Sequence, residues 1–396
     1  MFEDLHKGGQ PWPPISQIIM KITVVGIILL QCLLLSCKNK ENSDEIQNIN
    51  FLEKAIGENG INEIVEKIKI VEFDDNIDSY FSNPKKVIVS DERVYVLDKF
   101  NGRSIIKVFT KDCDFINMLD FFGKGPGEFI NISDFAIKHN GEIIINDIMQ
   151  SKLIYYNRDF KYLRSVKSDY YYEQIALLSD SLMAIVNNDN VAIGYKLLLI
   201  DDDSKILHKG VKVNELYDFM IGTPFQLNND GLRIHYLPYY SDTIYEVTSQ
   251  GVSLKYIMNF SSPVLRYKDV KSGINLGHPD FGKYINSLNL KETSGVISLR
   301  YSIGSAKYIS FYGKQSNISR SLKLTTIKEC QCGPLISFVG IHNDYFISIV
   351  SGNDLAKLLN IIDPSRDKTE VVHSDTRSNN TMEENVSYLV KMKFKI

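Results

Sequence analysis

A hairpin pattern that returns at a nearly constant interval is the feature of this sequence that most limits its fold. Each copy has an apolar strand end, four or five turn-forming residues and an apolar strand start. The copies begin at Phe109, Tyr156, Ile200 and, more loosely, Val247, in steps of 47, 44 and 47 residues. Repeats of this length made of short strands are typical of β-propellers, in which each repeat forms one four-stranded blade.

The C-terminal half of the chain supplies the remaining expected blades. Tyr308–Gly313 and residues 318–327 are interpreted as strands of one further blade, and Leu359–Pro364 as another hairpin. The sequence therefore predicts an all-β, six-bladed β-propeller of four-stranded antiparallel blades over residues 61–396, with seven blades as the alternative count.

Both ends of this region have the alternation of a half-buried strand. Ile64–Phe73 alternates near the start, and Tyr388–Phe394 alternates apolar residues with lysines at the end. An open sheet edge invites aggregation, so a propeller ring has to close. We expect the N-terminal strand to complete the blade that is built from the C-terminus.

One segment, residues 261–295, does not fit the repeat and is predicted to be an insertion on one face of the ring. Asp280 is a suitable cap for a short helix over Asp280–Leu290. Loops on a rigid scaffold often carry specificity. His278 and Asp280 are therefore candidate ligand-facing residues.

The N-terminus has the pattern of a targeting signal. Lys21 precedes an apolar run, and Leu34-Leu35-Ser36-Cys37 resembles the lipobox of bacterial lipoproteins. The alternative is a transmembrane helix, but the run is shorter than the roughly 20 residues that a span needs. We predict a signal peptide over residues 20–36, lipidation at Cys37, and a flexible polar tether over 37–60.

Residues 1–19 contain two early acids and three prolines, which suits neither a signal peptide nor a helix. We expect translation to start at Met20, so that residues 1–19 are a mis-assigned upstream extension. Lys38 follows the lipid site, which favours an outer-membrane lipoprotein, periplasmic or surface-exposed, held to the membrane by its N-terminal lipid.

These features together resemble the six-bladed β-propeller lipoproteins of the Bacteroidota, which are related to NHL-type propellers. The motifs that carry the resemblance are Val94–Asp98, Gly123–Phe129, Ser241–Tyr245 and Tyr388–Phe394. The resemblance implies the fold and a cell-envelope location. It implies no particular activity.

The Gly123–Phe129 motif, GKGPGEF, has two interpretations. Glycine-rich loops can bind phosphate through backbone amides, but Pro126 lacks that donor and extended chain follows. The preferred interpretation is a structural corner between blades, in which glycines adopt positive φ and Glu128 bonds the backbone. Its predicted residues are Gly123, Gly125, Pro126, Gly127 and Glu128.

The remaining polar motifs do not have the ligand number of a metal site. Cys330 and Cys332 are one residue apart with no further ligand nearby, and Asp201–Asp203 lacks the spacing of a calcium loop. Asp98 and Asp147 recur at equivalent strand ends, where aspartate commonly caps a turn. No metal and no cofactor are predicted.

The expected function follows from what the chain lacks as well as from its fold. A net charge of −3 without a basic stripe argues against a nucleic-acid partner. His235 and Tyr236 lie among aromatic residues that suit a ligand, but no catalytic motif is recognised. We expect a lipid-anchored module that binds a glycan, a peptide or a partner protein rather than an enzyme. The alternative is a metal-dependent hydrolase or lactonase with its site on the propeller axis, and the side chains lining that axis discriminate between the two.

Overall fold

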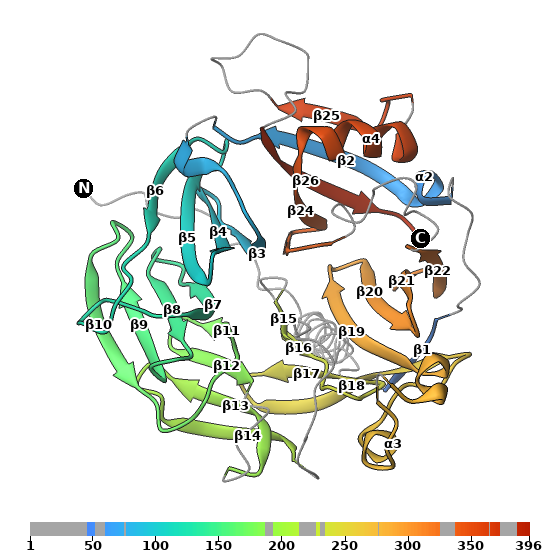
Figure 1. Ribbon diagram of the computed structural model, residues 1–396, viewed down its shortest axis with the longest axis horizontal. Coiled ribbons are helices and arrows are strands. Elements are labelled where there is room, and N and C mark those ends of the chain that lie inside the picture. Colours follow the sequence, from blue (N-terminus) through green and yellow to red (C-terminus); the bar gives the residue numbers. More distant parts are fainter. Residues whose placement is uncertain are drawn as a thin grey trace, which may run out of the picture. The chain divides into compact units, whose positions relative to one another are not determined.

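The structure is a computed structural model that describes residues 46–51, 60–74, 77–186, 193–213, 227–229, 234–275, 277–324, 337–363, 365–372 and 386–396. Within these residues the strands form six sheets arranged around a common axis as a six-bladed β-propeller (Figure 1). The prediction of six four-stranded antiparallel blades is confirmed, and the seven-bladed alternative is wrong.

Blades 1 to 3 are simple four-stranded meanders in chain order. Blade 1 comprises β3 (Pro84–Val89), β4 (Arg93–Phe100), β5 (Arg103–Thr110) and β6 (Phe115–Leu119). Blade 2 comprises β7 (Ile132–Ile137), β8 (Ile143–Asp147), β9 (Lys152–Tyr156) and β10 (Tyr162–Lys167). Blade 3 comprises β11 (Gln174–Ser179), β12 (Leu182–Val186), β13 (Tyr195–Asp201) and β14 (Ile206–Lys212). The repeated hairpin of the sequence is thus the turn between the third and fourth strands.

Blades 4 and 5 follow the same order, and blade 4 gains a fifth strand. Blade 4 comprises β15 (Leu227–Asn229), β16 (Ile234–Tyr236), β17 (Thr243–Thr248) and β18 (Gly251–Phe260), with β1 (Gln47–Phe51) parallel to β18. Blade 5 comprises β19 (Ile285–Glu292), β20 (Val296–Ile303), β21 (Ala306–Gly313) and β22 (Ile318–Lys323).

Blade 6 closes the ring with strands from both ends of the chain. It comprises β23 (Gly340–His342), β24 (Tyr345–Ser351), β26 (Ser387–Phe394) and β2 (Val65–Glu72), with β25 (Thr369–Val372) parallel to β2. β2 pairs antiparallel with β26 from Val65 opposite Phe394 to Glu72 opposite Tyr388. The predicted closure between the N-terminal and C-terminal strands is confirmed, and it leaves neither strand as a bare edge.

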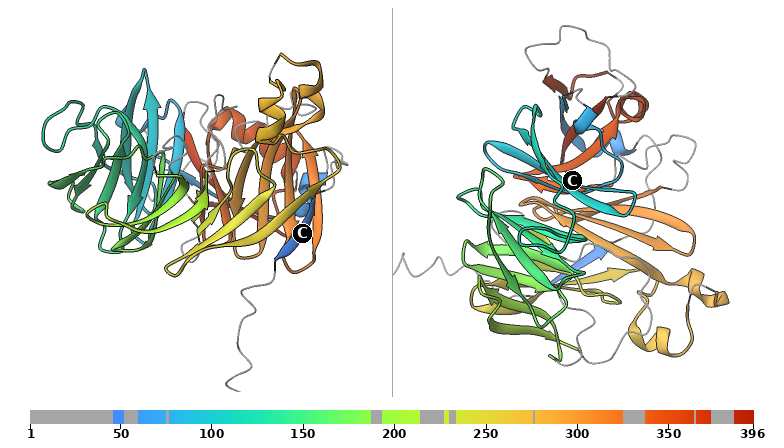
Figure 2. Two further views of the ribbon diagram at one scale, coloured as in Figure 1. Left: turned by 90° about the horizontal axis from the view of Figure 1, so that it is seen from below. Right: turned by 60° about the vertical axis from the view of Figure 1, so that its left-hand side comes forward.

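Short helices are added at three places outside the sheets. They are α2 (Gly60–Ile64), α3 (Tyr267–Lys271) and α4 (Gly352–Ile362), with the 3₁₀ turns η1 (Ile77–Ser79) and η2 (Pro279–Lys283). Figure 2 shows α3 projecting from the edge of the ring. Among the described residues, no helix is both long and apolar enough to cross a membrane.

The predicted hairpin at Leu359–Pro364 is wrong, because Leu359 to Ile362 belong to helix α4. The helix begins after Ser351, whose side chain accepts a hydrogen bond from the backbone of Asp354. Leu355, Leu358, Leu359 and Ile362 are buried at helical spacing and join the core of blade 6.

Two predicted boundaries are also corrected. Residues 47–51 form strand β1, so the interval 37–60 expected as a tether contains a strand of the fold. In the expected insertion, the helix over Asp280–Leu290 is instead the single turn η2 followed by β19, the inner strand of blade 5. The alternating burial along β19 explains why this segment is a strand rather than a helix.

Aspartates at the ends of equivalent strands hold the connections between blades. The Asp98 carboxylate at the end of β4 accepts the backbone amides of Ser82 (3.0 Å) and Asn83 (2.7 Å). The Asp147 carboxylate at the end of β8 accepts the amide of Ile130 at 2.8 Å. Both aspartates are buried, and each satisfies donors that the turn would otherwise leave unpaired.

Candidate functional site

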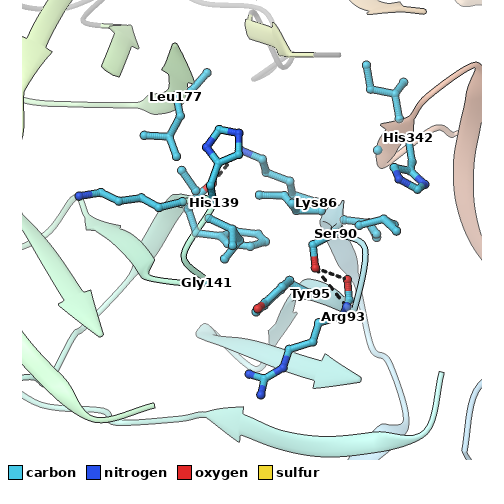
Figure 3. A pocket seen from close by; sticks show the side chains of 18 of the residues that line it. Lys86, Ser90, Arg93, Tyr95, His139, Gly141, Leu177 and His342 are labelled. Atoms are coloured by element: carbon cyan, nitrogen blue, oxygen red, sulfur yellow. Dashed lines mark hydrogen bonds between the residues drawn. The ribbon is translucent and has the colours of Figure 1, made fainter. Parts of the chain in front are cut away.

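A cavity of about 550 Å³ lies where the innermost strands of all six blades meet. Figure 3 shows side chains reaching it from several blades, including Leu177 on β11 and His342 on β23. Its volume is in the range of roughly 300–1,000 Å³ that is usual for small-molecule sites. It is the best-formed candidate site among the described residues.

The inner strands contribute aliphatic side chains to the cavity wall beside its polar and charged residues. Typical wall residues are Val87, Ile88, Ile137, Ala176, Leu177 and Ile341. Blades 6 and 1 approach closely here, since the amide of Val87 donates to the carbonyl of Val339 at 2.9 Å. A Cβ on Gly340 would lie 2.5 Å from the Val87 carbonyl oxygen, so this approach requires glycine.

Lys86 on β3 and Asp134 on β7 form an ion pair that links blades 1 and 2 beside the cavity. The Lys86 Nζ lies 2.6 Å from Asp134 Oδ1 and donates to the Phe135 carbonyl at 2.9 Å. The same carboxylate accepts the amides of Phe135 (2.8 Å) and Ile175 (2.9 Å), and Ile175 belongs to blade 3. Asp134 is only 2% exposed, and these three donors account for both of its oxygens.

Lys291 contributes a second ammonium group to the cavity from β19. Burial, reinforced by the positive charge of Lys86 and opposed by Asp134, lowers the pKa of Lys291 to about 8. The effect of Lys86 exceeds that of Asp134.

The hairpins at the end of the inner strands form a charged mouth. His139 is 90% exposed, and its Nδ1 lies 2.9 Å from Asp180 Oδ1. Arg93 donates to the carbonyl of Arg158 at 2.7 Å, and Arg158 is ion-paired with Glu92. Among the described residues that line the cavity, five are lysine or arginine and two are acidic. Three of these five cations are ion-paired: Lys86 with Asp134, Lys138 with Glu142 and Asp202, and Arg158 with Glu92.

His235 and Tyr236, which were predicted to face a ligand, lie in the interior of the protein. His235 and Tyr236 on β16 are both completely buried, and neither lines the cavity. Their predicted ligand-facing position is therefore corrected. The aromatic neighbours that suggested a binding surface are packing partners, such as Tyr256, whose ring lies 5.8 Å from His235.

His235 belongs instead to a buried charge network between blades 4 and 5. Its Nδ1 lies 2.8 Å from Glu292 Oε2, and Lys314 Nζ lies 2.6 Å from Glu292 Oε1. Tyr256 also donates to Glu292, at 3.2 Å. Burial by itself would raise the pKa of Glu292, but His235 and Lys314 outweigh it and lower the pKa to about 2.

The other predicted site residues lie away from the cavity. His278 Nδ1 accepts the backbone amide of Asp280 at 3.1 Å, which caps η2, and Asp280 is ion-paired with Lys283. Cys37 lies outside the described residues, as do Cys330 and Cys332.

The GKGPGEF segment connects β6 of blade 1 to β7 of blade 2 and wraps around one carboxylate. Glu128 Oε2 accepts the amide of Gly125 at 2.8 Å. A Cβ on Gly123 would lie 2.0 Å from the same oxygen. Gly127 has a φ of +73° and packs against the ring of Tyr162. The loop amide is thus bonded to the protein's own carboxylate.

Sequence reasoning missed the residues that line the cavity. β3 also carries Lys85, and β19 carries several other polar residues, so neither Lys86 nor Lys291 stands out in the sequence. They are about two hundred residues apart, so their convergence is visible only in the folded ring. Among the described residues, no group of three or more histidine, cysteine, aspartate or glutamate side chains is arranged to hold a metal ion.

These features define the class of the protein as a six-bladed β-propeller with an axial cavity. The chain belongs to the family defined by the domain of unknown function DUF4934, whose model matches residues 46–383. No curated protein matches it.

Solved structures of low sequence identity share the fold. A Bacteroides fragilis NCTC 9343 protein, provisionally classed as exported, is 19% identical with a TM-score of 0.71, covering 88% of this chain and 100% of its own. A DUF4221 family member from Bacteroides vulgatus ATCC 8482 is 10% identical with a TM-score of 0.50, covering 84% and 97%. Virginiamycin B lyase from Staphylococcus aureus has a TM-score of 0.37 at 13% identity, covering 65% and 74%, which is too distant to support an argument.

Proposed function

We propose that this protein is a lipid-anchored binding module of the cell envelope whose ligand enters the axial cavity. The observation that carries the proposal is the cavity itself, to which all six blades contribute and whose size suits a small molecule or the end of a chain. The aliphatic part of its wall suits the apolar part of a small organic molecule or of a peptide end.

Binding to the cavity is tested by narrowing it. Leu177 lines the wall, so Leu177→Trp fills part of the space. The matched control is Leu163→Trp on the outer strand β10, where the side chain is 48% exposed. A panel of short acetylated peptides, oligosaccharides and small organic acids is titrated by calorimetry. We expect at least one compound to bind the wild type and Leu163→Trp with equal affinity, and Leu177→Trp at least tenfold more weakly. Absence of binding, or equal binding by both variants, contradicts the proposal.

The cell-envelope part of the proposal rests on the sequence Leu34-Leu35-Ser36-Cys37 and on the export class of the Bacteroides fragilis relative. Two or more acyl chains on one residue anchor a protein stably, whereas a single chain is marginal. Cells are labelled with an alkynyl palmitate analogue. We expect labelling of the wild type and of Cys32→Ser, and none of Cys37→Ser. Labelling that survives Cys37→Ser contradicts lipidation at this residue.

A further inference from the structure

We propose that the axial cavity selects organic anions with an apolar body, and that the ammonium groups of Lys86 and Lys291 receive the anionic group. This inference rests on the proposed function, because it names the class of ligand that the same cavity takes. The shared chemistry is a carboxylate or a comparable acid group on an apolar compound, whether a free organic acid or the C-terminus of a peptide.

The first argument is the placement of charge relative to apolar surface. Lys86 lies near the start of β3, whereas Ser90 to Arg93 form the hairpin at its other end. Between Lys86 and this hairpin, β3 contributes the aliphatic residues Val87, Ile88 and Val89 to the cavity lining. A ligand that enters through the hairpins therefore passes along apolar wall before it meets Lys86.

The second argument is that the acid nearest to these lysines is already committed. Asp134 accepts two backbone amides from blades 2 and 3 in addition to its bond with Lys86. Its charge is therefore shared among three donors, and Lys86 lowers the pKa of Lys291 more than Asp134 raises it. A ligand anion brings the negative charge that this arrangement favours.

The third argument is the neighbouring strand of blade 5. Ser298 on β20 is paired with Lys291, and Arg300 lies two positions further along the same strand. Residues two apart on a strand share a face of the sheet, so Arg300 adds a permanent positive charge on the side of Lys291. Its guanidinium donates to Ser337 Oγ at 3.1 Å.

The test uses two fluorescent probes with the same aromatic body. 8-Anilino-1-naphthalenesulfonate carries an anionic group, and N-phenyl-1-naphthylamine is its neutral counterpart. We expect the wild type to bind the sulfonate at least tenfold more tightly than the amine. Lys291→Gln is expected to weaken sulfonate binding about tenfold and to leave amine binding unchanged, because a charge-assisted contact is lost. Lys167→Gln on the outer strand β10 is the matched control and is expected to change neither.

A conservative variant separates charge from packing. Lys291→Arg keeps the positive charge, so it is expected to restore sulfonate binding. Because the pKa of Lys291 is about 8, sulfonate affinity of the wild type is expected to fall as the pH rises from 7 to 9.5, and Lys291→Arg is expected to show no such fall. His342 also lines the cavity, but burial and the charge of Lys391 lower its pKa, so it is neutral over this interval. Lys86 is ion-paired with Asp134.

Two competitor pairs then distinguish the sources of the acid. Octanoate and octanamide represent a free organic acid, and acetyl-trileucine as its acid and its amide represents a peptide end. If octanoate displaces the sulfonate more strongly than the peptide acid does, the ligand is a free organic acid; the reverse order assigns it to a peptide C-terminus. If the wild type binds both probes with equal affinity and Leu177→Trp binds neither, the anion inference is overturned, whereas binding in the cavity is still supported. Binding of neither probe, or equal binding by Leu177→Trp and Leu163→Trp, overturns both.

Discussion

Glu128 explains why glycine stands at two positions, Gly123 and Gly125, of the corner between blades 1 and 2. Its carboxylate occupies the space where the Cβ atoms of Gly123 and Gly125 would lie, at 2.0 and 3.0 Å. Gln150 on the next turn donates to the carbonyls of Gly123 (3.1 Å) and Glu128 (3.3 Å), which fixes the loop from outside. At this scale the glycines of the motif leave room for one half-buried carboxylate.

Substitution of Gly123 tests this explanation. Gly123→Ala displaces the Glu128 carboxylate and breaks its bond with the Gly125 amide, so it is expected to destabilise the protein by about 0.5–1.5 kcal/mol, the usual worth of one hydrogen bond. Gly295→Ala is the control and is expected to change stability by less than about 0.5 kcal/mol, since nothing lies within 4 Å of its Cβ. Both are measured by urea unfolding. If Gly123→Ala has the midpoint of the wild type, the close approach to Glu128 is wrong.

A second variant makes the attribution specific. Glu128→Ala removes the carboxylate that would meet the new methyl group. We expect Gly123→Ala to cost less in the Glu128→Ala background than in the wild type, because residues in contact are not additive. Equal costs in the two backgrounds would mean that the strain arises elsewhere in the loop.

At the scale of elements, β1 is an addition to blade 4 that shields its outer strand. Ile49 and Phe51 are buried against the core shared by blades 4 and 5, whereas Asn50 between them is exposed. The Phe51 ring stacks on Phe260 with 5.4 Å between centroids. The strand therefore buries one face and covers the edge that β18 would otherwise present.

The contribution of β1 is measurable by truncating its buried side chain. Phe51→Ala is expected to destabilise the protein by about 3–5 kcal/mol, the usual cost of removing a buried aromatic ring. Asn50→Ala is the matched control on the exposed face, with an expected change of less than about 1 kcal/mol. Urea unfolding followed by intrinsic fluorescence measures both. Equal midpoints for the two variants would show that β1 adds nothing to the fold.

At the scale of the whole molecule, the ring is held by links between blades as well as by packing. β2 and β26 close it with strands from both ends of the chain. Asp134 joins blades 1, 2 and 3, and Glu292 joins blades 4 and 5 through His235. Each link is a buried carboxylate that several donors satisfy, so the loss of one charge affects two blades.

The Glu292 link predicts how stability depends on pH. The pKa of Glu292 is about 2 in the folded protein, below its ordinary value of 4.5, so folding favours the charged form. The stabilisation is complete above about pH 4.5 and is lost as the pH falls from 4.5 to 2, by an amount on the order of 3 kcal/mol.

Glu292→Gln removes this contribution while keeping the shape of the side chain. We expect the variant to be less stable than the wild type at pH 7 and the difference to shrink between pH 4.5 and 2, as measured by thermal unfolding at each pH. Glu142→Gln, in the hairpin between β7 and β8 where the side chain is 18% exposed, is the comparison carboxylate. A difference between wild type and Glu292→Gln that does not change with pH would contradict the lowered pKa.

Several elements were predictable because their signal is local. The hairpins at Phe109, Tyr156, Ile200 and Val247 are all turns between third and fourth strands of blades. By contrast, Leu359–Pro364 has the local pattern of a hairpin end, and only the longer spacing of its leucines shows a helix. QNINF at residues 47–51 is too short and too polar to indicate a strand until β18 lies beside it.

What the sequence by itself determined is the repeating unit, the number of blades and the strands that close the ring. These follow from the alternation of apolar residues and the spacing of turns, which are properties of neighbouring residues. Only the tertiary structure decided the site. The radial packing of six blades brings Lys86 and Lys291 to one cavity and buries His235 against Glu292, because a ring places the inner strands of distant repeats around a common axis.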